Sequence, residues 1–361
     1  MQIKDLLMTM VERQASDLFL RAESAPRLRV EGRMITLEHA PLSAQEMWNL
    51  SREVIPEEKG IDRLKVELDS DFALSISGVG RFRVNVFLQR GTPAMVIRHI
   101  KDTVGSFEQL NLPAEILKRF SQETQGLILV TGPAGSGKST TISTMLQYVN
   151  ENMERHIITV EDPIEFLFRD KNSFINQREL GLDVQSYPSA LKHFTLQSPD
   201  IIYIGVIRDP ETMYAAMSAA ETGVLVVSTL HTIDAVQTIE RVINLYPPHL
   251  HGEVKMQLSL LLKGVITLRL LPRTEGAGRI PAYETMVLTP TIARLIREGK
   301  LTEIKHFIEE GAMFGMQSFR QSLVKLVKEG KVSEVEARSY ADSKDEFDLE
   351  LRGIKRIANS V

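Results

Sequence analysis

Two patterns of apolar residues divide this sequence. Over residues 1–103, short segments alternate apolar with polar positions, and alternation with a period of two predicts half-buried strands. The clearest of these segments are Arg27–Val30 and Phe82–Phe87. Helical spacing of apolar residues is found at Ile3–Glu12 and Ala44–Ile55. The sequence therefore predicts a small α+β domain over residues 1–103, followed by a linker at 104–113 that contains a glycine and a proline.

Beyond Gly126 the apolar residues form continuous runs instead of alternating. Each run is followed by a small, polar or charged residue, and helical stretches lie between the runs. The runs are Leu127–Val130, Ile157–Val160, Ile201–Ile204 and Leu225–Val227. Strands buried on both faces that alternate with helices predict an α/β domain with a parallel sheet over residues 114–361. From about residue 280 the pattern becomes helical, with amphipathic stretches at Thr291–Glu298, Gln317–Glu329 and Ser333–Ala341.

The first of these apolar runs leads into a glycine-rich segment that fits the pattern G-x-x-x-x-G-K-[ST]. Its residues are Gly132, Pro133, Ala134, Gly135, Ser136, Gly137, Lys138, Ser139 and Thr140. Glycines allow consecutive backbone N–H groups to face phosphates, the lysine reaches the β- and γ-phosphates, and the Ser139 hydroxyl is placed to bind Mg²⁺. A helix is predicted from Lys138 to about residue 149, which sets the phosphates at a helix N-terminus. ATP and Mg²⁺ are the expected ligands, although phosphate loops of this kind serve kinases, GTPases and motors alike.

Composition limits the remaining possibilities. The 361 residues are 43% hydrophobic and 25% charged, with a net charge of −4 and no cysteine. This length suits two domains, and the lack of a strongly basic segment argues against a nucleic-acid partner. Without cysteine the chain has neither disulfides nor thiolate zinc sites, which fits a cytoplasmic protein. The N-terminus lacks a signal-peptide pattern, and the apolar stretch Leu258–Leu271 is too short and too charged to span a bilayer.

Five further segments, in order along nearly the whole chain, resemble the PilT/PilU type IV pilus retraction ATPases of the secretion/motor ATPase superfamily. They are Ala15–Leu20 (A-S-D-L-F-L), Gly80–Asn85 (G-R-F-R-V-N), Val160–Phe166 (V-E-D-P-I-E-F), Thr229–Thr232 (T-L-H-T) and Gly315–Phe319 (G-M-Q-S-F). Phe19 and the segment 341–345 favour a PilU-like paralogue. The related assembly and type II secretion ATPases usually carry a four-cysteine zinc module, so the lack of cysteine favours the retraction branch.

The resemblance implies a PAS-like N-terminal domain and a RecA-like ATPase domain with C-terminal helices. It also implies a homo-hexamer with nucleotide bound between subunits. The expected function is that of a motor subunit for pilus retraction and twitching motility. Such a motor would work in the cytoplasm, at the inner-membrane base of the pilus, with a platform protein and a paralogous ATPase as partners.

Acidic residues follow the second apolar run of the ATPase domain, at Glu161, Asp162 and Glu165. Ligands of open α/β sheets bind at this end of the strands, so these carboxylates are candidates for orienting the attacking water. The alternative is an acidic helix start, which the helix dipole favours. The resemblance, in which this segment is the Asp box, favours catalytic roles for Glu161 and Glu165.

Two other sets of candidates depend more on the resemblance. His231 at the end of a strand is either a structural histidine or, as its match to the family's His box implies, a catalytic residue that senses nucleotide. Three arginines on N-terminal strands are either solvated or act as arginine fingers on a neighbour's phosphates. These are Arg81, Arg83 and Arg98.

The sequence also departs from the family pattern. Val206 stands where relatives carry the Walker B glutamate that polarises water, Val224 replaces the first His-box histidine, and Leu196 replaces an arginine. We expect these three changes to surround one site and to weaken hydrolysis, since a valine side chain neither accepts a proton nor orients water. A weak ATPase, a nucleotide-binding pseudo-ATPase that regulates an active paralogue, and an engineered variant all remain open. Arg208 and Asp209, next in the chain, form either a structural ion pair or part of the catalytic site.

Overall fold

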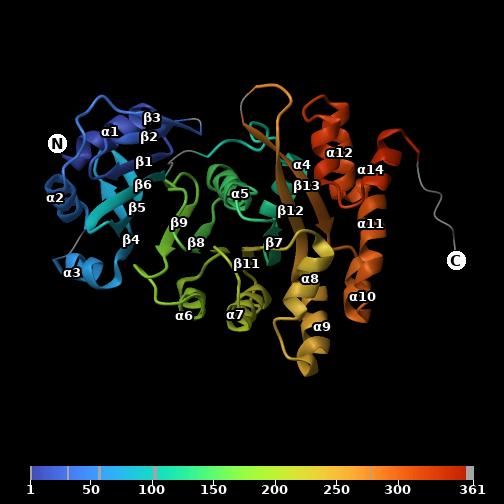
Figure 1. Cartoon of the computed structure of the whole chain (residues 1–361). Helices are drawn as coiled ribbons and strands as arrows, with labels where there is room; N and C mark the ends of the chain where they lie inside the picture. The colour runs from blue at the N-terminus through green and yellow to red at the C-terminus, as the bar shows by residue number, and fades with distance from the viewer. Residues whose placement is uncertain (1, 31, 56–57, 101–103, 277, 355–361) are drawn as a thin grey trace. The chain divides into compact units, whose positions relative to one another are not determined.

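The computed structural model describes residues 2–30, 32–55, 58–100, 104–276 and 278–354 (Figure 1). The chain divides into two compact units. The first is Met1–Thr103 together with Glu165–Leu167, and the second is Val104–Ile164 together with Phe168–Val361. Residues 104–113, expected to be a linker, fall in the second unit because Phe107 is buried in its core and Leu112 packs against the same core.

The N-terminal unit is an antiparallel sheet with helices. Its elements are α1 (Ile3–Glu12), β1 (Asp17–Arg21), β2 (Arg27–Val30), β3 (Arg33–Thr36), α2 (Ala44–Val54), α3 (Glu58–Glu67), β4 (Asp69–Ile76), β5 (Gly80–Gln89) and β6 (Thr92–Ile100). The strand order is β3-β2-β1-β6-β5-β4. Alternation along β5 buries Phe82, Val84 and Val86 on one face, against apolar side chains of α1 and α2. This confirms the α+β character that the period-two pattern predicts.

The second unit is built on a seven-stranded sheet. Its first elements are α4 (Ala114–Ser121), β7 (Gly126–Thr131), α5 (Lys138–Asn152), β8 (His156–Glu161), β9 (Phe174–Glu179), α6 (Tyr187–Phe194), η1 (Thr195–Gln197), β10 (Ile201–Ile204), α7 (Pro210–Glu221) and β11 (Leu225–Leu230). They are followed by α8 (Ala235–Ile243), η2 (Pro248–Leu250), α9 (His251–Leu261), β12 (Leu262–Pro272) and β13 (Arg279–Val287). The strand order is β13-β12-β7-β11-β10-β8-β9, and neighbouring strands are parallel except for β13 against β12.

The central strands are apolar because both faces of the sheet are covered. All residues of β7, β10 and β11 are buried, with α4 and α5 on one face and α6 and α7 on the other (Figure 1). At Gly264 of β12, an added Cβ would lie 2.1 Å from Cζ of Phe120 and 2.7 Å from the Met286 carbonyl oxygen. Only glycine lets α4 approach the sheet this closely.

The C-terminal part begins with a strand where the sequence pattern indicated helix from about residue 280. Residues 279–287 form β13, and most of its side chains are buried. It shows neither alternation nor a continuous apolar run, because the buried polar residues Glu284 and Thr285 interrupt its apolar residues. The helices follow: α10 (Pro290–Glu298), η3 (Leu301–Glu303), α11 (Ile304–Glu310), η4 (Ala312–Phe314), α12 (Phe319–Lys328), α13 (Glu334–Tyr340) and α14 (Lys344–Leu351).

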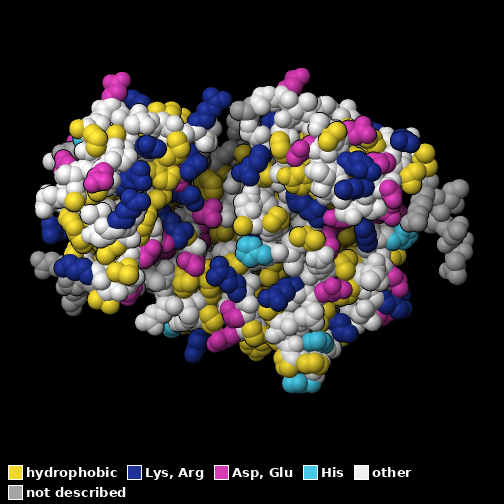
Figure 2. All heavy atoms as spheres, viewed as in Figure 1, with side chains coloured by type: hydrophobic (Ala, Val, Ile, Leu, Met, Phe, Trp, Pro, Cys, Tyr) yellow, Lys and Arg dark blue, Asp and Glu magenta, His cyan; other side chains and the backbone are white. Residues whose placement is uncertain are grey.

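Ion pairs hold the C-terminal helices to one another. Arg320 of α12 contacts three carboxylates, those of Glu309, Glu346 and Glu350, and Arg338 of α13 pairs with Asp348 of α14 at 2.9 Å. Basic and acidic side chains lie interspersed over these helices (Figure 2). Across the described part of the chain, no helix is both long and apolar enough to span a membrane.

Candidate nucleotide site

Four parallel strands bring the predicted site residues to one edge of the sheet. β7, β11, β10 and β8 are neighbours, and all four end at this edge. Gly132 follows β7, His231 follows β11, Gly205 and Val206 follow β10, and Glu161 is the last residue of β8. The carboxyl edge of a parallel sheet is where such folds bind ligands. Residues separated by up to about 100 positions in the sequence thus meet because of strand order alone.

The glycine-rich loop at this edge has the backbone that phosphate binding needs. Gly132 has φ of 140° and Gly137 φ of 94°, both in the region that favours glycine. A Cβ on Gly132 would lie 2.3 Å from the Leu268 carbonyl oxygen. Gly137 is the N-cap of α5, and because it has no side chain, it does not cap the first N–H groups of this helix. The loop is therefore a preformed anion site at a helix N-terminus.

Lys138 is 8% exposed and lies across this loop. Its ammonium donates to the carbonyl oxygens of Gly132 at 2.8 Å and Pro133 at 2.9 Å. The side chain is thus held at the loop, as an interaction with β- and γ-phosphates requires. Pro133, Ala134 and Gly135 are exposed, whereas Ser139 and Thr140 are half-buried at the start of α5.

Ser136, inside the loop, is 3% exposed, and its buried hydroxyl has no hydrogen-bond partner among the described residues. An unsatisfied buried polar atom is costly in a folded protein, and it commonly marks a place that a ligand completes. The loop residues that the sequence singled out, Gly132 to Thr140, therefore form one continuous cradle.

Glu161 is buried at the end of β8 and is held by two donors. The hydroxyl of Thr159 donates to its Oε1 at 2.6 Å, and the side-chain amide of Gln177 on β9 donates to the same atom at 3.2 Å. A fixed carboxylate at this edge is suited to orienting a water molecule. Gln177 carried no signal in the sequence, since its role depends on the pairing of β8 with β9. Glu165 is exposed and belongs to the N-terminal unit, so the structure does not group it with Glu161.

Val206 lies between the ends of β8 and β11. The Gly205 N–H donates to the Val160 carbonyl at 2.8 Å, and the Ile207 N–H donates to the Thr229 carbonyl at 3.2 Å. A Cβ on Gly205 would lie 3.3 Å from Oη of Tyr187, on α6. Val206 is 9% exposed, so a nearly buried apolar side chain follows β10 at the same edge of the sheet at which the phosphate loop follows β7.

His231 is largely exposed after the end of β11, and its pKa responds to partial burial and to two positive side chains. Burial, together with the positive charges of Lys138 and Arg208, lowers the pKa of His231 below its usual value. The imidazole is therefore neutral at pH 7, and one ring nitrogen is available as an acceptor. Asp209 caps α7, accepting from the N–H of Thr212 at 2.8 Å and from its hydroxyl at 2.8 Å. The role that the structure gives Asp209 is thus a structural one.

The other two departures from the family pattern lie elsewhere, which corrects the expectation that all three surround one site. Val224 precedes the first residue of β11, whereas His231 follows its last, so about 20 Å of strand separates them. Leu196 lies in η1 and is 81% exposed; two residues later the Ser198 carbonyl contacts His156 at the beginning of β8. Only Val206 lies at the carboxyl edge, because a parallel strand places its two ends at opposite edges of the sheet.

The three N-terminal arginines share the outer face of the first unit's sheet. Arg81 and Arg83 lie on β5, and Arg98 lies on β6 directly opposite Arg83. Arg83 donates to both oxygens of Asp71, and Arg98 donates to Asp17 at 3.0 Å. These contacts lie within the N-terminal unit.

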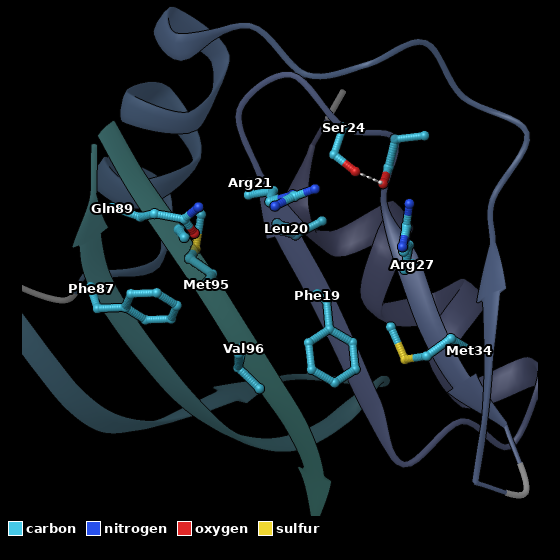
Figure 3. A pocket seen from close by; sticks show the side chains of 12 residues that line it. Phe19, Leu20, Arg21, Ser24, Arg27, Met34, Phe87, Gln89, Met95 and Val96 are labelled. Atoms are coloured by element: carbon cyan, nitrogen blue, oxygen red, sulfur yellow. Dashed lines mark hydrogen bonds between the residues drawn. The ribbon is translucent and has the colours of Figure 1, made fainter. Parts of the chain in front are cut away.

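A groove on the same unit is mainly apolar. Its lining includes Phe19, Met34, Phe87 and Val96, together with the polar side chains of Arg21, Ser24, Arg27 and Gln89. Figure 3 shows Phe19 with Val96 on one side and Met34 on the other. None of the site residues predicted from the sequence is among the residues that line this groove.

Comparisons with known proteins identify the family of this chain. The family model described as "Type II/IV secretion system protein" matches residues 1–339. The Pseudomonas aeruginosa protein named type IV pilus ATPase PilU is 39% identical, over 98% of this chain and 92% of its own length. PilT of the same organism is 40% identical, over 96% and 100%, so identity alone does not distinguish a PilU-like from a PilT-like chain. A crystal structure of the pilus retraction motor PilT with bound ADP superimposes with a TM-score of 0.89 at 39% identity, covering 96% of this chain and 98% of that one. The chain therefore belongs to the type II/IV secretion system protein family, among the type IV pilus ATPases that PilU and PilT represent.

Proposed function

We propose that this chain is a motor subunit for type IV pilus retraction, which binds Mg-ATP, assembles as a homo-hexamer and hydrolyses ATP slowly. The observation that carries the proposal is the phosphate loop between β7 and α5, in a chain that matches a retraction motor with bound ADP over nearly its full length. We further place it in the cytoplasm, at the inner-membrane base of the pilus, with the platform protein as partner.

In this proposal the loop residues Gly132 to Thr140 hold the phosphates. The unsatisfied Ser136 hydroxyl and the uncapped N–H groups of α5 supply donors, and Lys138 supplies positive charge. Ser139, half-buried at the start of the helix, supplies the hydroxyl for Mg²⁺. When bound, the metal would neutralise phosphate charge during phosphoryl transfer.

The remaining chemistry falls to the residues at the ends of β8 and β11. Glu161, fixed by Thr159 and Gln177, orients the attacking water, and neutral His231 contacts the phosphates or that water. Glu165 contributes only if the N-terminal unit brings it to the same place. Arg81, Arg83 and Arg98 act on a neighbouring subunit's nucleotide, for which Arg83 and Arg98 exchange Asp71 and Asp17 for phosphate.

One observation favours a second function, that of a nucleotide-binding pseudo-ATPase that regulates an active paralogue. Val206 is a nearly buried apolar residue at the end of β10, at the edge where the phosphate loop follows β7, and the resemblance assigns the water-polarising glutamate of relatives to this position. Val224 and Leu196 no longer support this alternative, because they lie away from that edge.

Restoring the carboxylate tests the proposal. Val206→Glu is expected to raise kcat for ATP hydrolysis by at least about tenfold with little change in KM, because general-base groups contribute about 10²–10⁴-fold and act in the transition state. Val206→Gln is the matched control, because glutamine is similar in size to glutamate but cannot act as a base; it is expected to leave kcat low.

Rates are measured for the purified chain alone and mixed with a PilT paralogue. No hydrolysis by the parent or by Val206→Glu, with stimulation of the paralogue, would support the pseudo-ATPase instead. Brisk hydrolysis by the parent that Glu161→Gln abolishes would identify Glu161 as a sufficient base and contradict the role given to Val206.

A further inference from the structure

Two charged residues, the buried Glu284 and the half-buried Arg269, project from β13 and β12, beside the candidate site but outside the phosphate loop. The side chain of Arg269 on β12 is 13% exposed, and Glu284 on β13 is 5% exposed. Thr267 is directly opposite Glu284, and Arg269 is two residues further along, so both charged side chains leave the same face of the sheet. These strands contact α8 as well as α12 and α13 (Figure 1). Burying such groups is costly unless each is well bonded, so their partners are informative.

Glu284 bonds to the beginnings of two helices. Its Oε1 accepts from the N–H of Ala235, the first residue of α8, at 2.8 Å. The backbone N–H of Phe319, the first residue of α12, also stabilises its charged form. A carboxylate between two helix N-termini interacts favourably with both dipoles. Glu284 therefore connects the segment after His231 to the start of the C-terminal helices.

Arg269 connects the same two regions at a second place. One guanidinium nitrogen donates to the Tyr340 carbonyl at the end of α13, at 2.9 Å. The other donates to Asp342 at 3.0 Å and to the carbonyl of Ile233 at 3.4 Å. The guanidinium also lies 4.1 Å from the centre of the Phe319 ring. Ile233 lies two residues after His231, so the arginine reaches from the His231 segment to α12 and α13.

The segment between β11 and α8 is short and is hydrogen-bonded to α8. It consists of residues 231–234, with His231 at its start. Asp234 caps α8 through the Gln237 N–H at 2.7 Å, and the hydroxyls of Thr232 and Thr238 lie 2.6 Å apart. Because these contacts tie the segment to α8, we expect a displacement at Ile233 or Ala235 to move the whole segment, including His231.

We propose that Arg269 and Glu284 are positioning residues that couple the His231 segment to α12–α14, so that a displacement of these helices changes the position of His231 at the nucleotide site. This deepens the proposed function, on which the role of His231 rests. Ion pairs of Arg320 and Arg338 link α12 and α13 to α14. By thermodynamic linkage, nucleotide bound at His231 must in turn stabilise one position of the helices.

Hydrogen exchange measured by mass spectrometry on the full chain tests the linkage without requiring catalysis. In Arg269→Gln, amide exchange is expected to become at least about fivefold faster both at residues 231–238 and at 334–342, because charge-assisted bonds to both segments are lost. Exchange in β7 should stay as in the parent. Arg279→Gln, the same substitution at an exposed position of β13, is the matched control and is expected to change neither segment.

If Arg269→Gln also speeds exchange in β7, the same exchange measurement is made on Arg269→Lys. This variant keeps the positive charge but lacks the planar guanidinium that bonds to both segments. Unchanged exchange at residues 231–238 in the variant that keeps β7 intact would overturn the proposal.

A double-mutant cycle on kcat adds a readout that general destabilisation does not reproduce. If Arg269 acts through His231, Arg269→Gln is expected to lower kcat in the parent but to have little further effect in His231→Gln. Additive losses would show that Arg269 acts independently of His231 and would contradict the coupling. If the chain hydrolyses no ATP, the proposed function fails, whereas the exchange experiment still decides whether the two segments are linked.

Discussion

Glu284→Gln is expected to change how the stability of this protein depends on pH. Burial raises the pKa of Glu284 from 4.5 to about 7, and the nearby charge of Asp234 adds to the increase. The N–H groups of Ala235 and Phe319 and the charge of Lys305 act in the opposite direction. Burial dominates because the carboxylate is 5% exposed at the junction of β13, α8 and α12.

The sign follows from which state holds the proton. Below pH 4.5 the carboxyl is protonated in both the folded and the unfolded chain. Between pH 4.5 and about 7 the folded chain keeps a proton that the unfolded chain has released, so the free energy of unfolding falls as pH rises. Above about pH 7 the carboxyl is ionised in both states, and the decrease in the free energy of unfolding is complete. At about 1.4 kcal/mol for each unit of pKa difference, the loss between pH 5 and 8 is about 2.5 kcal/mol.

A glutamine at position 284 does not titrate, so it removes this contribution to the pH dependence of the free energy of unfolding. The free energy of unfolding of Glu284→Gln minus that of the parent is expected to rise by about 2.5 kcal/mol from pH 5 to pH 8. Chemical denaturation followed by circular dichroism at four pH values measures it, and the subtraction cancels the other titrating groups. Glu253→Gln, at an exposed position of α9, is the control for the chemical change. A difference that stays constant with pH would refute the account of Glu284 as a carboxyl destabilised by burial.

Three further predictions concern binding, assembly and packing. Lys138→Ala is expected to weaken ATP binding at least about tenfold in a fluorescent-nucleotide titration, since a charge-assisted phosphate contact is lost; equal affinity would remove the assignment of the loop. Light scattering with Mg-ATP is expected to show a ring of about 240 kDa, six times the 40.7 kDa chain, and a strictly monomeric species would count against a motor. Gly264→Ala is expected to destabilise the ATPase unit by about 1–3 kcal/mol, because its methyl group would overlap Phe120; an unchanged melting temperature would contradict this packing.

The position of Val206 makes it the informative departure from the family pattern. The three apolar replacements look equivalent in the sequence, but they occupy different edges of the sheet. A change at the amino edge does not alter the groups that face phosphate at the carboxyl edge. Of the three replacements, only Val206 therefore supports the expectation of weakened hydrolysis. How far hydrolysis is weakened depends on whether Glu161 orients water by itself.

The sequence by itself determined the elements and the phosphate loop. Period-two alternation identified strands of the first unit, and continuous apolar runs identified β7, β8, β10 and β11, because burial on one face or on both leaves a direct record in residue type. The loop was recognisable because its glycines and Lys138 must be contiguous to surround a phosphate.

Only the tertiary structure decided which distant residues meet. Strand order β7-β11-β10-β8 brought His231, Val206 and Glu161 beside the loop, and strand direction removed Val224 from them. β13 was missed because its buried polar residues Glu284 and Thr285 interrupt the apolar run, and Gln177, Arg269 and Glu284 gave no signal as isolated polar residues. Their roles arise from contacts across 16 to 73 positions of sequence, as in Gln177 with Glu161 and Arg269 with Asp342. Local pattern records whether a residue is buried, whereas its partner is set by how the whole sheet is assembled.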